Sequence, residues 1–435
     1  KEVYTFCIFL FIYNNFCIIV VLINCAMKNK FILEMQSRGY LNQCTDLEKL
    51  KKISNKPIIG YIGFDCTANS LHVGSLLQIM VFRLMQKYGH KPIVLLGGGT
   101  TRIGDPSGKD KTRKILTEKE IDKNTKNIEK ILKKFLNNND PKTKPIFVNN
   151  YSWLKNLNYI SFLREIGKHF TINKMLTFES VKTRLDREQS LSYMEFNYMI
   201  LQAYDFLELN KKENCSLQIG GSDQWGNIVN GTELIKRYSS KQAYGLTTPL
   251  ITLSSGAKMG KTESGAIWLD EKLLSSYDYW QFWRNIDDRD VIKFLKMFTD
   301  LDIEEIDKMK DEDINKLKIK LANETTTMLH GLKAAKSSEQ AAKEAFSGTS
   351  LGSNLPSIKI KKTDIENKIS IIDLVILSKL ENSKSEIRRL IKGNAIKLND
   401  EIISQENLII SYELFRQNYL KLSVGKKRHL KIELS

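Results

Sequence analysis

Residues 57–98 read PIIGYIGFDCTANSLHVGSLLQIMVFRLMQKYGHKPIVLLGG, and this stretch decides the fold class. Two apolar runs, PIIGYIGF and PIVLLGG, flank a helical pattern from about residue 70 to residue 88. A strand, a helix and a second strand in this order predict a parallel βαβ unit. The second run ends in a glycine-rich turn, which is typical of a backbone that a ligand approaches closely.

The same pattern continues further along the chain. Residues 215–221, CSLQIGG, form a third apolar run with its own glycine turn, and residues 224–238 predict a helix. Residues 117–170 alternate charged helical segments with one short strand candidate, PIFVNN. In open α/β sheets, ligands collect beyond the carboxyl ends of the strands, where these turns would lie. We predict an α/β fold with a Rossmann-like parallel sheet.

The amino-acid composition limits the kinds of molecule that the protein is expected to bind. Lys and Arg number 67 against 50 Asp and Glu in 435 residues, a formal charge of +17. This excess favours a polyanion such as nucleic acid or an acidic membrane surface, and a generally lysine-rich proteome is the plainer alternative. The six scattered cysteines form no CxxC pair, which argues against structural zinc and a disulfide scaffold and fits a reducing compartment.

The first 26 residues are the main oddity. From Val3 to Ala26 the chain is uncharged and largely apolar, long enough to resemble a membrane span or the core of a signal peptide. It has Lys1 as its basic flank, and MKNKF at Met27 reads like an ordinary cytosolic start. We expect residues 1–26 to be translated upstream sequence outside the mature fold; a membrane leader is the alternative.

Residues 197–209, NYMILQAYDFLEL, place a polar stripe on an otherwise apolar helix. Tyr198, Gln202 and Asp205 stand at i, i+4 and i+7, so hydroxyl, amide and carboxylate share one face. Burying an unpaired polar group costs about 1–3 kcal/mol, so this stripe needs polar partners. Either a small polar ligand or a self-satisfied core network would provide them.

Three loops combine glycines with polar or cationic side chains. FDCTANSLHVGSL, at 64–76, offers Asn69 and Ser70 as helix N-caps and His72 in the first turn, and a helix N-terminus suits a phosphate. GGGTTRIGDPSGKDKTR and SSGAKMGKTESG, at 97–113 and 254–265, follow, and the last lacks the spacing of a P-loop. Each could be an ordinary flexible loop, but three of them after strand candidates favour a polyphosphate site.

Over residues 28–435 the chain resembles tyrosyl-tRNA synthetases of the bacterial and mitochondrial kind. HVGS at 72–75 is similar to the HIGH signature of the class I enzymes, and KMGKT at 258–262 to the KMSKS loop. GDPSGK, LQAYDF and GGSDQWGN occur between them in the family's order. Tryptophanyl-tRNA synthetases share the fold, but the LQAYD helix and the YIGFD strand favour tyrosine.

The resemblance implies roles for particular residues. It implies tyrosine binding by Tyr61, Asp105, Tyr198, Gln202, Asp205 and Gln224. It implies ATP binding by Gly63, Asp65, Thr67, His72, Gly74, Ser75, Gly221, Asp223 and Lys261. The residues expected to act on the departing pyrophosphate are His72, Lys109, Arg113, Lys258, Lys261 and Thr262. ATP would enter with Mg2+, and no protein-bound metal is expected.

Three positions depart from the family pattern. Ser75 stands in place of the second histidine of HIGH, so a ring contact to the ATP ribose is lost or replaced by a hydroxyl. Cys66 stands where the family often has proline, which would leave that turn less rigid. Ile62 cannot supply a side-chain hydrogen bond to the ribose. We expect ATP to bind more weakly than in a HIGH enzyme.

Basic residues of the C-terminal region favour RNA. The segment KSEIRRLIKG and the turn GKKRH, next to a hairpin signal at Leu398–Asn399–Asp400, suit recognition of an RNA backbone, with a solvated basic face as the alternative. The region resembles the small RNA-binding fold that these synthetases share with a ribosomal protein. The candidate RNA-binding residues are Arg388, Arg389, Lys392, Lys426, Lys427 and Arg428.

We therefore predict a tyrosine–tRNA ligase, cytoplasmic and homodimeric, whose partners are tRNA for tyrosine, L-tyrosine and ATP, with no membrane. Its expected parts are a leader (1–26), a Rossmann-like catalytic domain (27–250), a mobile signature loop with a helical anticodon-side domain (251–347), a linker (348–370) and a small α+β RNA-binding domain (371–435). The continuous helix expected at 275–347 falls in the third part. The alternatives are a synthetase-fold RNA-binding protein without aminoacylation activity, an adenylate former for another aromatic amino acid, and a membrane-tethered synthetase.

Overall fold

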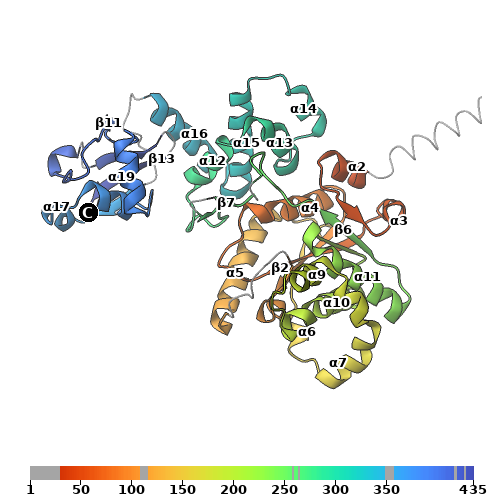
Figure 1. Ribbon diagram of the computed structural model, residues 1–435. Coiled ribbons are helices and arrows are strands. Elements are labelled where there is room, and N and C mark those ends of the chain that lie inside the picture. Colours follow the sequence, from red (N-terminus) through yellow and green to blue (C-terminus); the bar gives the residue numbers. More distant parts are fainter. Residues whose placement is uncertain are drawn as a thin grey trace, which may run out of the picture. The chain divides into compact units, whose positions relative to one another are not determined.

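The computed structural model describes residues 30–107, 116–256, 259–262, 265–347, 357–415, 419–425 and 428–435, with the backbone alone for 261–262 and 345–347 (Figure 1). The leader expected at residues 1–26 lies outside the described residues. The chain divides into two compact units, one up to Thr252 and one from Leu253 to Ser435. Each unit has a hydrophobic core of its own.

The described part of the first unit is built on a six-stranded sheet in the order β1-β6-β5-β2-β3-β4. Strands β6, β5, β2, β3 and β4 are parallel to their neighbours, and the edge strand β1 is antiparallel to β6. The α/β class with a parallel sheet is confirmed, and the four apolar runs expected as strands are β2, β3, β4 and β5. The strands are β1 (Gln43–Cys44), β2 (Ile59–Asp65), β3 (Lys91–Gly97), β4 (Ile146–Asn149), β5 (Leu217–Gly221) and β6 (Tyr244–Thr248).

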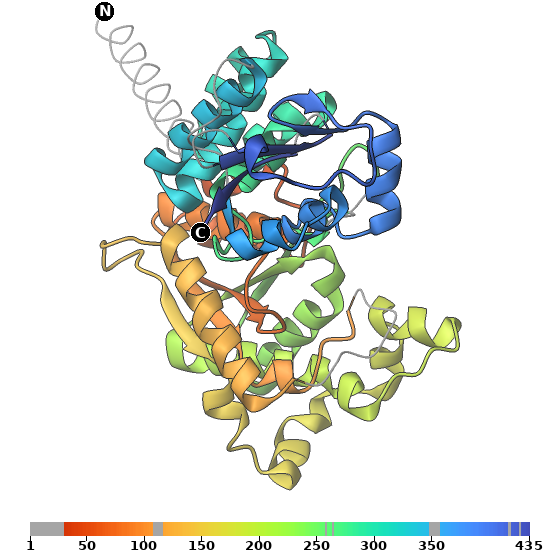
Figure 2. The ribbon, with the colours of Figure 1, turned by 90° about the vertical axis from the view of Figure 1, so that its left-hand side faces the viewer.

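Helices and short 3-10 turns connect these strands. In Figure 2, α5 is the orange helix that runs beside the sheet, and it packs against β3 and α4. The helices are α2 (Lys30–Ser37), α3 (Leu47–Ile53), α4 (Leu76–Lys87), α5 (Glu118–Phe135), α6 (Tyr151–Leu154), α7 (Tyr159–Glu165), α8 (Ile172–Leu176), α9 (Glu179–Asp186), α10 (Tyr193–Glu213) and α11 (Trp225–Ser239). The 3-10 turns are η1 (Val73–Ser75), η2 (Thr100–Arg102), η3 (Gly167–His169) and η4 (Ser222–Gln224).

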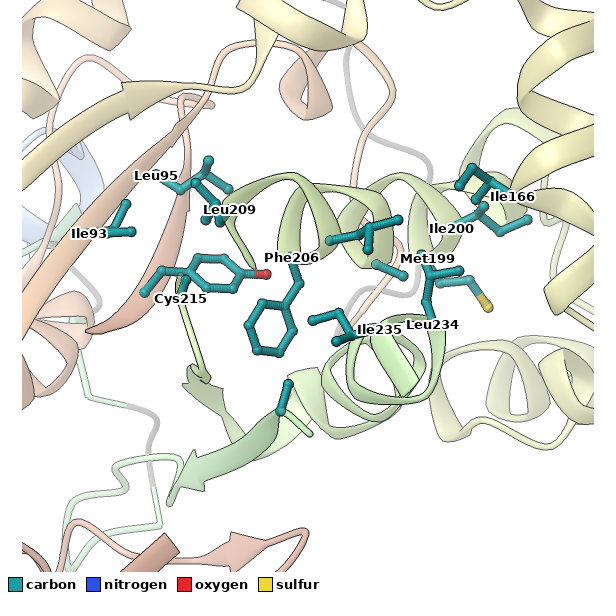
Figure 3. Packing of buried hydrophobic residues seen from close by; sticks show 14 of the residues in the cluster. Ile93, Leu95, Ile166, Met199, Ile200, Phe206, Leu209, Cys215, Leu234 and Ile235 are labelled. Carbon is teal, nitrogen blue, oxygen red and sulfur yellow. The ribbon is translucent and has the colours of Figure 1, made fainter. Parts of the chain in front are cut away.

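The core of the first unit lies between α10, α11 and the sheet (Figure 3). Met199, Ala203 and Phe206 recur on α10 at helical spacing and are at most 2% exposed. Because side chains three and four residues apart share a helix face, this spacing buries one side of α10. The buried face fixes the rotation of α10 and therefore also where its polar stripe points.

The expected N-caps of the first helix are wrong. Ser70 donates its hydroxyl hydrogen bond to the carbonyl of Leu71, and Asn69 accepts one from Asn127 on α5. The chain instead forms η1, in which the Nδ1 of His72 accepts the backbone N–H of Gly74 at 3.0 Å. A 3-10 turn therefore delays the helix until Leu76, and capping preferences alone cannot foresee such a turn.

The second unit begins with a two-stranded hairpin and a group of helices. A single continuous helix over 275–347 is wrong, because the chain turns repeatedly. Gly331, at φ +88°, separates α15 from α16, and a left-handed backbone of this kind ends a helix. The elements are β7 (Lys261–Thr262), β8 (Gly265–Ala266), α12 (Ser276–Arg284), η5 (Asp288–Asp290), α13 (Val291–Phe298), α14 (Ile303–Lys308), α15 (Ile314–His330) and α16 (Leu332–Ser347).

The C-terminal part contains a five-stranded sheet in the order β11-β10-β12-β13-β9. The expected hairpin is present, since Asn399 and Asp400 turn with positive φ between β10 and β11. The linker is wrong in its second half, because β9 pairs with β13 from residue 357 onward. Lysine-rich composition concealed the alternation SIKI, which buries Ile360. The elements are β9 (Ser357–Ile360), α17 (Lys362–Glu366), α18 (Ile371–Leu377), α19 (Lys384–Lys392), β10 (Ile396–Leu398), β11 (Glu401–Ile402), η6 (Tyr412–Leu414), β12 (Tyr419–Val424) and β13 (Arg428–Leu434).

Candidate active site

A cavity of about 170 Å3 opens at the carboxyl ends of β2, β3 and β5. It is the crevice in which open parallel sheets hold their ligands. Gln78 on α4 and Gln218 on β5 also face it, although their sequence context gave no signal. The lining residues are Tyr61, Ile62, Gly63, Phe64, Asp65, Gln78, Leu95, Gly97, Thr100, Asp105, Tyr198, Gln202, Asp205, Gln218, Ile219, Gly220, Gly221 and Gln224.

The polar stripe of α10 faces this cavity. Tyr198, Gln202 and Asp205 all line it, as the helical spacing predicts. The Tyr198 hydroxyl donates to Asp65 at 2.9 Å, so the stripe reaches the end of β2. Much of its polarity is thus satisfied within the protein, and the remaining capacity points into the cavity.

Asp205 sits at one end of the cavity and is 1% exposed. Asn150 donates to one of its oxygens at 2.9 Å and the Trp153 ring N–H to the other at 2.7 Å. Burial nevertheless raises the pKa of the Asp205 carboxyl to about 7, while these two donors lower it. Asn150 directly follows β4 and Trp153 lies on α6, where no sequence motif pointed to the cavity.

Tyr61 lines the same end of the cavity, on β2. Its side chain is 1% exposed and packs on Phe206, with ring centroids 5.2 Å apart. Its hydroxyl oxygen is buried and has no hydrogen-bond partner. Burial, with the nearby charge of Asp205, raises the pKa of the Tyr61 hydroxyl well above its usual value. A buried hydroxyl without a partner is unfavourable, so this end of the cavity calls for a polar group.

A chain of hydrogen bonds joins Asp205 to Tyr198 along the cavity wall. Asn150 donates to the Thr100 hydroxyl at 3.0 Å as well as to Asp205. Thr100 in turn donates to Asp65 at 2.8 Å, and Asp65 accepts from Tyr198. These five side chains come from four separate segments, so this chain of hydrogen bonds connects two regions of the cavity.

Asp105 also lines the cavity and is 7% exposed. Gln224 donates to one Asp105 oxygen at 2.9 Å, and the backbone N–H of Ser107 to the other at 2.9 Å. Asn227 on α11 lies 3.1 Å from the amide oxygens of both Gln202 and Gln224, so it orients two of the expected tyrosine ligands. Asn227 belongs to the quoted GGSDQWGN motif, but sequence gave it no role.

Only some of the residues expected to bind ATP line the cavity. Gly63, Asp65 and Gly221 line the cavity, and Gly97 lies so close to Asp65 that a Cβ at Gly97 would be 2.2 Å from its Oδ1. The residues expected at the nucleotide that do not line the cavity are Thr67, His72, Gly74, Ser75 and Asp223, of which the first four follow β2 and the last follows β5. Lys109, Arg113 and Lys258 lie outside the described residues. Lys261 and Thr262 form β7 in the second unit, where their side chains are not described.

The basic residues of the small domain differ in availability. The side chains of Arg389 and Lys392 are 80% and 78% exposed, although Arg389 lies 2.8 Å from Glu386 and Lys392 lies 3.6 Å from Glu406. Arg428 instead donates to the carbonyl of Leu380 and lies 3.5 Å from Glu381, which ties it to a loop. Arg388 is 53% exposed and lies 3.5 Å from Glu406. Lys426 and Lys427 lie outside the described residues.

The described residues contain neither a cluster of metal ligands nor a membrane-spanning helix. Within them, no three His, Cys, Asp or Glu side chains gather closely enough to hold a metal ion. Among their helices, none combines the length and hydrophobicity needed to cross a lipid bilayer.

Two known families match successive parts of the chain, with a boundary that differs from that of the two compact units. Residues 52–347 match the family described as tRNA synthetases class I (W and Y). Residues 348–432 match the tyrosine–tRNA ligase SYY-like C-terminal domain. The sheet and the crevice at its carboxyl edge are thus those of a class I aminoacyl-tRNA synthetase, and the chain is a ligase.

Similar proteins narrow the family further. A tyrosine–tRNA ligase of Pelagibacter ubique is 71% identical over 407 residues, covering 93% of this chain and all of that protein. One from a Wolbachia of Brugia malayi is 54% identical, covering 94% of this chain and 99% of that protein. The crystal structure of a truncated mitochondrial tyrosyl-tRNA synthetase of Aspergillus nidulans matches with a TM-score of 0.65 and 30% identity, covering 72% of this chain and 93% of that one. This chain belongs to the bacterial-type tyrosine–tRNA ligases, as its motifs predicted.

Proposed function

We propose that the cavity binds L-tyrosine with its phenol hydroxyl between Tyr61 and Asp205. The observation that carries this proposal is the buried Tyr61 hydroxyl without a partner, next to a buried carboxylate. The phenol would donate to Asp205, whose oxygens have capacity beyond the bonds from Asn150 and Trp153, and would accept from Tyr61. Phenylalanine would leave both groups without this partner.

The ammonium group of tyrosine would lie at Asp105, Tyr198 and Gln202. What supports this is that a buried carboxylate and two oxygen acceptors line the same cavity. Gln224, already bonded to Asp105, would lie near the tyrosine carboxylate and the reacting phosphate. The substrate would therefore be held at both ends, which fixes the carboxylate for attack.

ATP, entering as its magnesium complex, would bind along the turn after β2 and the turn after β5. Gly63, Asp65, Thr67, His72, Gly74, Ser75, Gly221 and Asp223 are the residues that we assign to it, with Lys261. The tyrosine carboxylate would attack the α-phosphate and release pyrophosphate. Lys109, Arg113, Lys258, Lys261 and Thr262 would stabilise the charge on that leaving group together with His72. No protein nucleophile is required.

The second step would transfer the tyrosyl group to a ribose hydroxyl of tRNA for tyrosine. In the small domain, Arg389 and Lys392 are the most exposed of the described cations that we assign to RNA. These two, together with Arg388 and Arg428, would exchange their present glutamate partners for phosphates. Lys426 and Lys427 complete the set. Phosphate contacts of this kind make binding depend steeply on salt.

We further infer a homodimer that acts in the cytoplasm. An apolar groove of about 440 Å3 lies beside α6, α7 and the start of α10, and Tyr159, Ile160 and Tyr193 are 57%, 70% and 67% exposed nearby. Exposed apolar surface of this kind favours a protein interface. Met194→Asp should shift sedimentation from dimer to monomer, whereas Lys241→Asp, outside the groove, should not. The expected five-part division stays a proposal, with the linker shortened to 348–356.

The decisive experiment is tyrosine-dependent ATP–pyrophosphate exchange by a chain that begins at Met27. Exchange with tyrosine, and far less with phenylalanine or tryptophan, is the expected result. A folded protein without exchange that still bound RNA would instead favour a non-catalytic RNA-binding protein.

A further inference from the structure

The turn that follows β2 is held by its neighbours at one residue, Cys66. The backbone N–H of Cys66 donates to the hydroxyl of Thr101 at 2.7 Å. Its carbonyl accepts from the side-chain amide of Asn124 at 2.9 Å. Cys66 is 0% exposed, Thr101 9% and Asn124 7%, so water does not compete freely for either bond.

These bonds come from two segments distant in sequence. Thr101 belongs to η2, after β3, and its neighbour Thr100 donates to Asp65, so two successive threonines bind the last residue of β2 and the first residue of the turn. Asn124 belongs to α5, which runs beside the sheet (Figure 2). One helical turn further along α5, Asn127 donates to Asn69 at 2.6 Å. The turn after β2 is therefore enclosed from both sides.

We propose that Thr101 and Asn124 are positioning residues for ATP, which fix the turn through the two peptide groups of Cys66. The proposal rests on the nucleotide site assigned above, because Thr67 is the next residue along the chain and His72 lies in the same turn. A proline at position 66 would be another way to fix this turn. A proline has no N–H, so it fixes the turn covalently and needs no acceptor. Here, two hydrogen bonds provide the rigidity that the ring would give.

The first test is Thr101→Val, which keeps the shape and removes the acceptor. A buried N–H without a partner is unfavourable, so the turn should shift until water reaches it. We expect the KM for ATP to rise about tenfold, with the KM for tyrosine within about twofold of wild type. Thr101→Ser, which keeps a hydroxyl, should behave like wild type. Thr325→Val is the matched control, since that buried hydroxyl bonds within α15.

A proline substitution at position 66 distinguishes the contribution of the Thr101 hydrogen bond from that of the Asn124 hydrogen bond. Cys66→Pro in the Thr101→Val background removes the N–H that lost its acceptor, so the KM for ATP should return toward wild type. Asp65, the residue before it, is already extended at the end of β2, as a following proline requires. Asn124→Leu should also raise the KM for ATP, and Cys66→Pro should not repair it, because proline keeps the unpaired carbonyl. Cys66→Ala, which keeps both peptide groups, should have little effect.

Hydrogen exchange provides a readout independent of catalysis. The peptide that spans residues 64–72 should exchange faster in Thr101→Val than in wild type. If the wild-type enzyme lacked tyrosine-dependent exchange of pyrophosphate, the proposed function would fail. Hydrogen exchange would still show whether the two hydrogen bonds at Cys66 hold the turn in place. An unchanged KM for ATP in Thr101→Val, or repair of both variants by proline, would overturn the proposal.

Discussion

Tyr61→Phe should change the stability of the ligand-free protein and its use of tyrosine in opposite directions. The Tyr61 hydroxyl is buried without a partner, which costs about 1–3 kcal/mol in the absence of ligand. Phenylalanine at this position has no hydroxyl to satisfy and fills the same space against Phe206. The empty enzyme should therefore become more stable by about 1 kcal/mol, which corresponds to a rise in Tm of about 2–4 °C for a unit of this size.

The same substitution should weaken the use of tyrosine. One hydrogen bond to the substrate phenol is lost, so kcat/KM for tyrosine in pyrophosphate exchange should fall about tenfold. The value for phenylalanine should hardly change, because phenylalanine leaves the Tyr61 hydroxyl unpaired in wild type as well. Discrimination between the two amino acids should therefore fall by about the same factor of ten.

Scanning calorimetry without ligand and exchange kinetics with both amino acids test these two expectations. Tyr277→Phe is the matched control, because the Tyr277 hydroxyl is also buried but accepts a bond from Gln281 at 3.0 Å. That change should lower the Tm slightly and leave discrimination unaltered. The reasoning is refuted if Tyr61→Phe destabilises the empty enzyme, or if it lowers kcat/KM for both amino acids equally.

Three other changes have defined outcomes. Since the folded-state pKa of Asp205 is raised to about 7, the free energy of unfolding of the wild type should decrease as the pH rises from about 4 to about 7. Asp205→Asn should remove this slope, which is at most about 1.4 kcal/mol per pH unit in urea titrations. The same substitution should weaken selection against phenylalanine. Arg184→Met removes the cation that lies 3.1 Å from the buried Glu195 carboxylate, which keeps its hydrogen bonds from Ser192, and should cost about 3–5 kcal/mol in urea unfolding, with partial recovery on adding Glu195→Gln. Arg389→Ala should weaken tRNA binding and reduce the salt slope by about one, whereas Lys168→Ala should not.

Helical periodicity predicted which residues of α10 belong to the candidate site. Tyr198, Gln202 and Asp205 could be assigned to a common face from spacing alone, because α10 is long and its opposite face is apolar. Tyr61, Gly63 and Asp65 were assigned through the resemblance to the synthetase family and not from the strand pattern. A shared helix face depends on local geometry, which a sequence expresses directly.

The side chains that support the site could not be found in this way. Asn150, Trp153 and Thr101 act across separations of 35 to 55 residues, and their hydrogen bonds have no local pattern. The 3-10 turn at Val73–Ser75 and the break at Gly331 also escaped prediction, because backbone conformation there depends on tertiary context. The lysine-rich composition led to one wrong prediction, because the segment that forms β9 was assigned to a linker.

The hydrogen bonds that run from Tyr198 through Asp65, Thr100 and Asn150 to Asp205 have a practical consequence for engineering. Replacing a single member to admit an unnatural amino acid leaves its neighbours with stranded donors or acceptors, so beneficial changes here should be strongly epistatic. Libraries that randomise one codon at a time would discard them. Selection for new side chains should vary positions 65, 100, 150 and 205 together, and the winners should replace the polar set as a whole.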